Sequence, residues 1–129
     1  MLKNKHIRVI AFVAITLFYF SCNHYDQLTV NNSSNNTSRS HNVGKDCMSC
    51  HKKGGGGEGW FNVAGSAFQS NNAAAQNINV KLYTQANGTV NLVKEIQGDL
   101  LGNFYTTDII PFGQGLYPVV EYNGNQHFM

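Results

Sequence analysis

The sequence has few of the features that identify a catalytic domain. Its 129 residues include seven Asp and Glu, which are scattered with no spacing that selects a pair for acid–base chemistry. No Ser-His-Asp arrangement is supported, and the four consecutive glycines at 54–57 are not followed by the Lys-Ser/Thr of a phosphate-binding loop. The sequence therefore predicts a protein that is not an enzyme.

A long apolar run is also missing. The apolar stretch at residues 9–20 has twelve residues, too few to span a bilayer as a finished helix. It follows three basic residues within the first eight and precedes Ser21. A basic start, a short apolar segment and a small residue are typical of a secretory signal peptide, so we expect residues 1–21 to be removed during export.

The chain carries little excess charge once this segment is set aside. Nine Lys and Arg stand against seven Asp and Glu in the whole sequence, and residues 1–21 contain three of the basic residues and no acidic one. Six basic and seven acidic residues then remain, a formal charge of −1. Binding to nucleic acid normally needs a clustered basic surface, so no nucleic-acid partner is expected.

Cys22 follows the expected cleavage position directly. This arrangement resembles the lipobox of bacterial lipoproteins, in which the new N-terminal cysteine is acylated, with Tyr19 where that family prefers Leu. The resemblance implies that Cys22 is lipidated and that the exported chain is anchored to a membrane of the bacterial cell envelope. The alternative is an ordinary thiol in a signal-anchor helix.

Composition divides the exported part into three segments. Residues 22–42 contain an Asn- and Ser-rich stretch with few residues that can pack a core, so we expect a disordered tether. Residues 43–59 contain two of the three cysteines and the glycine run. Residues 60–129 have the pattern of a small β domain with one thin core.

Five segments after residue 60 have the composition and alternation of β-strands. Ile78, Val80 and Leu82 alternate with polar neighbours, which is the pattern of a half-buried strand. The five expected strands are 60–69, 77–85, 89–96, 102–110 and 116–123. Asn- and Gly-rich turns separate them, and no amphipathic helix is evident after residue 60. This spacing predicts a mainly β fold, a small sandwich.

The same region resembles a known family. The stretches "VAG", "INVKLY", "GNFYTT" and "GLYPVVEYNGN", within residues 63–125, are similar to the carboxypeptidase regulatory-like domain, a transthyretin-like β-sandwich. The resemblance implies a structural or binding module without catalysis.

The stretch "DCMSCH" at residues 46–51 carries the strongest chemical signal. Cys-x-x-Cys-His is the attachment motif of c-type haem. Two thiols that add to the vinyl groups of one porphyrin must lie on one face, and a short helical turn places residues three apart on one face. The resemblance to c-type cytochromes implies thioethers to haem c at Cys47 and Cys50, and His51 as an axial ligand of the iron.

Three other interpretations of the motif are open. A disulfide between Cys47 and Cys50 would close a very short loop and stabilise the fold little. A thioredoxin-like redox pair normally opens a helix in a βαβ unit, and no such unit is visible. Zinc would need a fourth ligand, and no second Cys/His pair exists.

The sixth iron ligand has three candidates. His41 precedes the motif by six residues, and His127 and Met129 end the chain. Of these we favour Met129 and interpret His41 as a tether residue. Methionine would raise the reduction potential, whereas histidine would lower it.

The sequence as a whole predicts an exported, membrane-anchored mono-haem c-type cytochrome that carries one electron between redox partner proteins. One alternative is a surface lipoprotein whose β-sandwich binds a polymer or protein, with the motif as a disulfide or metal staple. Another is a haem-based sensor or peroxidase with an open sixth position.

Overall fold

The computed structural model of the chain describes residues 31–86 and 90–129. The predicted signal peptide at 1–21, the lipidation site Cys22 and the first part of the tether lie outside the described residues. Among the residues that are described, no helix is long and apolar enough to cross a membrane.

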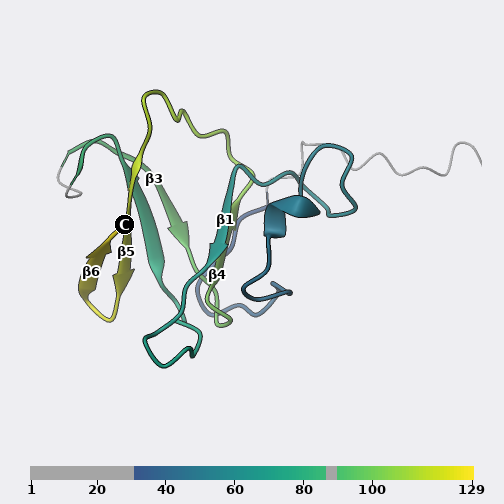
Figure 1. Cartoon of the computed structure of the whole chain (residues 1–129), viewed down its shortest axis with the longest axis horizontal. Helices are drawn as coiled ribbons and strands as arrows, with labels where there is room; N and C mark the ends of the chain where they lie inside the picture. Colours follow the sequence, from purple (N-terminus) through teal and green to yellow (C-terminus); the bar gives the residue numbers. More distant parts are fainter. Residues whose placement is uncertain (1–30, 87–89) are drawn as a thin grey trace, which may run out of the picture.

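The described chain forms two antiparallel sheets (Figure 1). β1 pairs with β4 in one sheet, and the order in the other is β3-β2-β5-β6. The strands are β1 (Val63–Ser66), β2 (Asn79–Tyr83), β3 (Leu92–Gln97), β4 (Asn103–Thr106), β5 (Tyr117–Tyr122) and β6 (Asn125–Phe128). The prediction of a mainly β fold is confirmed, and each of the five segments expected to be strands overlaps one of β1 to β5.

The strand β6 was not predicted. It forms a hairpin with β5, in which Tyr122 pairs with Asn125. Asn123 and Gly124 lie between them with φ of 49° and 77°. Two central residues at positive φ are the requirement of a type I′ turn, and Asn-Gly is the preferred pair. The Asn-Gly pair that signals this hairpin was therefore present in the sequence.

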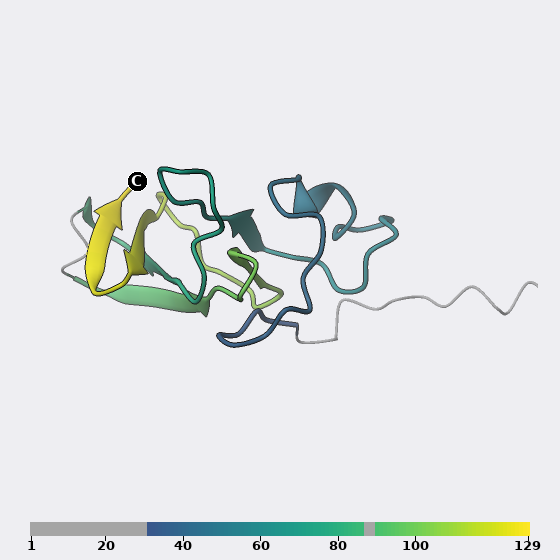
Figure 2. The same ribbon diagram turned by 90° about the horizontal axis from the view of Figure 1, so that it is seen from below.

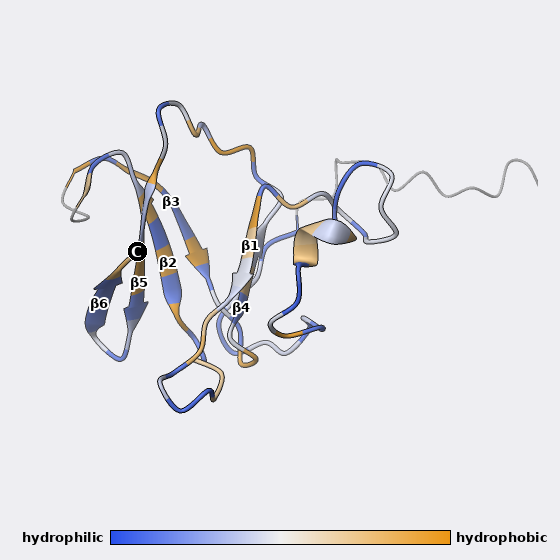
Figure 3. Ribbon diagram, in the orientation of Figure 1, coloured by the Kyte–Doolittle hydropathy of each residue, from blue (hydrophilic) through white to orange (hydrophobic). Residues whose placement is uncertain are grey.

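The core lies between the two sheets. Val80 and Leu82 of β2 are buried, and Val80 is paired with the buried Ile96 of β3. Val63 of β1 and Phe104 of β4 pack against this cluster from the smaller sheet. Figure 3 shows the alternation of hydrophilic and hydrophobic residues along β2 that puts one set of side chains in this core.

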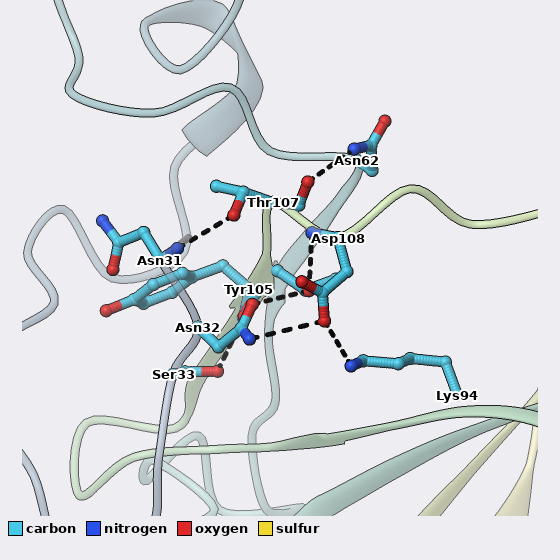
Figure 4. Close-up of polar contacts among 9 residues, drawn as sticks. Asn31, Asn32, Ser33, Asn62, Lys94, Tyr105, Thr107 and Asp108 are labelled. Carbon is cyan, nitrogen blue, oxygen red and sulfur yellow. Dashed lines mark hydrogen bonds and ion pairs between the residues drawn. The ribbon is translucent and has the colours of Figure 1, made fainter. Parts of the chain in front are cut away.

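The segment 31–42 is named here the strap, and its first residues, Asn31 to Ser33, lie beside β4 (Figure 4). Asn32 forms an antiparallel bridge with Thr106, and the backbone N–H of Ser33 donates to the carbonyl of Tyr105 at 3.0 Å. The backbone N–H of Asn31 donates to the hydroxyl of Thr107 at 2.9 Å. The sequence predicted a disordered tether over residues 22–42, whereas in the structure the backbone of Asn31 and Ser33 is hydrogen-bonded to the edge of β4 and to Thr107.

The turn that carries the cysteines and the C-terminal hairpin are far apart in the fold. η1, the 3₁₀ turn at Cys47–Ser49, and the C-terminal hairpin lie at opposite ends of the long axis in both views (Figures 1 and 2). The strap and the sheet β1-β4 lie between them (Figure 1). Residues near η1 therefore come from the first half of the described chain and from β4.

Candidate functional site

The Cys-x-x-Cys-His stretch is held as a single 3₁₀ turn. Asp46 caps it, since its carboxylate accepts from the backbone N–H of Met48 at 3.0 Å. The carbonyl of Cys47 accepts from the N–H groups of Cys50 at 3.3 Å and His51 at 3.1 Å. A 3₁₀ turn has three residues per turn, so side chains three apart are eclipsed. Cys47 and Cys50 therefore project from the same side of the turn, as attachment to one porphyrin requires.

Both cysteines in this turn are free thiols. Burial raises the pKa of the Cys47 thiol, and the carboxylate of Asp46 adds to this effect, against a smaller lowering by a backbone hydrogen bond. Catalytic thiols of disulfide oxidoreductases have lowered pKa values, because the thiolate is the nucleophile. The shift at Cys47 has the opposite direction, which does not favour the thioredoxin-like interpretation.

The imidazole of His51 has a defined tautomer. Its ring is buried, and Nδ1 lies 2.9 Å from the carbonyl oxygen of Glu58 and 3.3 Å from that of Gly59. Carbonyl oxygens only accept, so Nδ1 must carry the proton and donate it. In the neutral ring Nε2 then has a free lone pair, and no hydrogen bond reaches it from the described residues. A histidine that ligates a metal typically donates its other ring N–H to such a partner.

Two aromatic rings support this imidazole. His51 stacks on Phe61 with ring centres 4.0 Å apart and planes 7° apart. Phe61 stacks in turn on Tyr105 of β4, at 4.6 Å and 15°. Burial raises the pKa of the Tyr105 phenol, and the nearby Asp99 adds to the rise while Arg39 opposes it. The stack fixes the plane of the His51 ring against β4.

The glycine run gives the chain room beside His51. A side chain at Gly57 would lie 2.7 Å from Nδ1 of His51, and one at Gly55 would lie 2.0 Å from the carbonyl oxygen of Cys50. Gly54 has a φ of +75°, which favours glycine. The run passes directly beside the motif, in contact with Cys50 and His51. It thereby brings the carbonyls of Glu58 and Gly59 to Nδ1.

A cavity of about 820 Å³ opens over this arrangement. Its volume lies in the range of about 300–1,000 Å³ that is typical of cofactor sites. Three parts of the chain line it: the strap, the motif with the glycine run, and the stacked rings of Phe61 and Tyr105. All three motif residues, Cys47, Cys50 and His51, contribute to the lining. The cavity therefore has two thiols and one imidazole in its wall.

The strap contributes one side chain that was not predicted for the site, Arg39, and one that was a candidate ligand, His41. Arg39 and His41 both line the cavity, and Lys45 lies beside them. The His41 ring centre is 6.0 Å from that of His51, with the planes tilted by 39°. No sequence signal pointed to Arg39, because the segment was interpreted as a disordered tether and its position depends on hydrogen bonds to distant residues.

Other predicted residues are not brought to this cavity. Met129 and His127 are exposed in or beside β6, at the opposite end of the molecule from η1 (Figures 1 and 2). The hairpin pairs the end of the chain with β5, where the backbone N–H of Met129 donates to the carbonyl of Pro118 at 3.2 Å. The structure therefore does not place Met129 as a sixth ligand.

The donor set of the cavity fits a haem c better than a bare metal ion. Within residues 31–86 and 90–129, no group of three His, Cys, Asp or Glu side chains gathers as ligands for an ion. Haem iron already has four porphyrin nitrogens, so one or two protein ligands complete its coordination. His51 would supply one ligand and the two thiols the covalent bonds.

No family model, no curated protein and no solved structure matches the chain.

Proposed function

We propose that this chain is a mono-haem c-type cytochrome, exported and anchored to a membrane of the bacterial cell envelope through lipidated Cys22, which carries one electron between redox partner proteins. One observation carries the proposal. Nδ1 of His51 donates to the backbone carbonyls of Glu58 and Gly59, which leaves a lone pair on Nε2, and His51 lines a cavity that Cys47 and Cys50 also line.

The protein and the cofactor have separate tasks in this proposal. When bound, the haem supplies the one-electron chemistry of its iron. Cys47 and Cys50 would hold it covalently, and His51, fixed by the hydrogen bonds at Nδ1, would be its protein ligand. Arg39 and Lys45, which line the same cavity, would supply positive charge for the carboxylates of the cofactor.

The β domain serves as the rigid frame of the site. We propose that it belongs to the transthyretin-like sandwiches, on the sequence resemblance within residues 63–125 and on two antiparallel sheets that enclose one core. In this proposal the sheet β1-β4 supports the haem segment through Tyr105 and Phe61. The sheet β3-β2-β5-β6 has no residue in the lining of the cavity.

A spectrum of the reduced protein in alkaline pyridine tests the proposal. The protein is made in a host that matures c-type haem, then denatured and extracted with acidified acetone. Covalent haem stays with the polypeptide and gives the band of a haem with two thioethers. We expect the Cys47→Ser and Cys50→Ser single variants to shift this band, and the double variant to lose it.

A matched control separates attachment from folding. The Ser49→Ala variant lies in the same turn and retains both thiols, so it should retain the band. A wild-type protein that folds but is colourless would contradict the proposal. The cysteines would then be a disulfide or metal staple, and the chain a surface lipoprotein that binds a polymer or protein.

A further inference from the structure

We infer that His41 is the second axial ligand of the iron, so that the site holds its cofactor between two imidazoles. This inference rests on the proposed function. The two rings lie 6.0 Å apart between centres and both line the same cavity. Metal–imidazole bonds are about 2 Å long, as zinc sites show. Two imidazoles that bind one ion from opposite sides then have their ring centres about 6 Å apart, once the distance from each nitrogen to its ring centre is added.

The imidazole of His41 has no competing partner. Its side chain is exposed at the rim of the cavity, and no hydrogen bond to it exists among the described residues. The two methionines that are described are poorly placed by comparison. Met48 lies inside the turn that carries both thiols, and Met129 lies at the other end of the molecule (Figure 1).

Residues on both sides of His41 are hydrogen-bonded to the β1-β4 sheet or to the connection that leads into β4. On one side, the hydroxyl of Ser40 donates to the carboxylate of Asp99 and accepts from Nδ2 of Asn103 at 2.8 Å. Asp99 and Asn103 are each only 1% exposed, so this attachment point is buried. On the other side, the N–H of Gly44 donates to the hydroxyl of Ser66 in β1 at 3.0 Å. A ligand held in this way loses little conformational entropy when it binds.

In this arrangement, protein ligands would fill both axial positions of the iron. Two histidines favour a lower reduction potential than histidine with methionine. A filled sixth position also leaves no open place for a small ligand. The structure therefore favours electron transfer over the sensor or peroxidase alternative, and the strap acquires a function that its Asn- and Ser-rich composition does not indicate.

The experiment uses the haem-loaded full chain with three single variants. Electronic and electron paramagnetic resonance spectra of the ferric protein report the spin state, and carbon monoxide binding to the ferrous protein reports an open position. We expect a low-spin wild type that does not bind carbon monoxide. His41→Ala should become high spin and bind carbon monoxide, and added imidazole should restore the low-spin spectrum. His41→Met should remain low spin with a higher midpoint potential.

His127→Ala is the matched control, since it also removes an exposed imidazole. It should have the spectrum and potential of the wild type. Covalent haem with spectra unchanged by His41→Ala would overturn the inference and leave the proposed function intact. A high-spin wild type that binds carbon monoxide would also overturn it, and would favour the sensor or peroxidase alternative. If the proposed function itself is wrong, the wild type will have no covalent haem. That result differs from both outcomes above.

Discussion

The backbone of Gly57 lies directly against the imidazole of His51. A Cβ atom added at Gly57 would be 2.7 Å from Nδ1 and 2.8 Å from Cγ of that ring. The ring cannot move away freely, because Phe61 stacks on it at 4.0 Å. The contact with His51 therefore requires glycine at position 57. A positive φ does not explain this glycine, because Gly57 has none.

We predict that Gly57→Ala damages the site, whereas Gly56→Ala does not. A Cβ at Gly56 meets no atom within 4 Å, and neither glycine has a positive φ. Overpacking of this kind typically costs about 1–3 kcal/mol, so Gly57→Ala should lower the free energy of unfolding by that amount. Gly56→Ala should leave it unchanged or raise it by up to about 1 kcal/mol. Urea unfolding of the two variants measures the difference, and equal effects would contradict the close contact.

Phe61 should be the most sensitive ring in the site. It is 7% exposed and stacks on both His51 and Tyr105. Truncation of a buried Phe to Ala costs about 3–5 kcal/mol, so Phe61→Ala should destabilise the domain by about 3 kcal/mol or more. Phe112, which is 47% exposed, is the matched control, and Phe112→Ala should change the unfolding free energy by less than about 0.5 kcal/mol.

The thiol of Cys47 should be slow to react in the protein without cofactor. Its pKa is raised by burial, so less thiolate is present at a given pH than in an unfolded chain. In a variant with Cys22→Ser and Cys50→Ser, alkylation of Cys47 should be slower in the folded protein than in urea. The alkylation rate of the folded protein should keep rising at pH values where the rate in urea has levelled. Coincident pH profiles would show that Cys47 is not protected.

The ion pair between Lys94 and Asp108 should give the domain a pH-dependent stability. The hydrogen bond from Lys94 is the main cause that lowers the pKa of Asp108 in the folded protein, and Asn32 donates to the same carboxylate at 3.4 Å (Figure 4). A folded-state pKa below the unfolded value of about 3.9 stabilises the fold above that pH. The contribution is then lost as the pH falls through the folded-state pKa.

The size of this effect is small because both groups are partly solvated, with side-chain exposures of 28% and 32%. We expect Asp108→Asn to lower the unfolding free energy by about 0.2–1 kcal/mol at pH 7, and the difference from the wild type to shrink below pH 4. Urea unfolding at pH 7 and pH 3 measures it. In a Lys94→Met background the same substitution should have a smaller effect, and an undiminished effect would assign the stabilisation to the hydrogen bonds with Asn32 and Thr106 instead.

Local sequence accounts for the parts of this protein that depend on neighbours along the chain. The spacing of Cys47, Cys50 and His51 is covalent, so one 3₁₀ turn is enough to place both thiols on one side. The alternation of Ile78, Val80 and Leu82 likewise predicts β2 and its buried face, because side chains of a strand alternate between its two sides.

Tertiary structure decided what surrounds the motif. The strap looks like a solvated spacer in sequence, since Asn and Ser can bond equally to water. A backbone bridge to β4 and hydrogen bonds to the buried pair Asp99 and Asn103 hold it in place. His41 of the strap thereby lines the cavity. The end of the chain shows the converse. Met129 is a reasonable ligand by chemistry, but pairing of β6 with β5 holds it at the far end of the molecule. Spacing along a chain determines which side chains share one turn, whereas long-range hydrogen bonds and packing determine which turns meet.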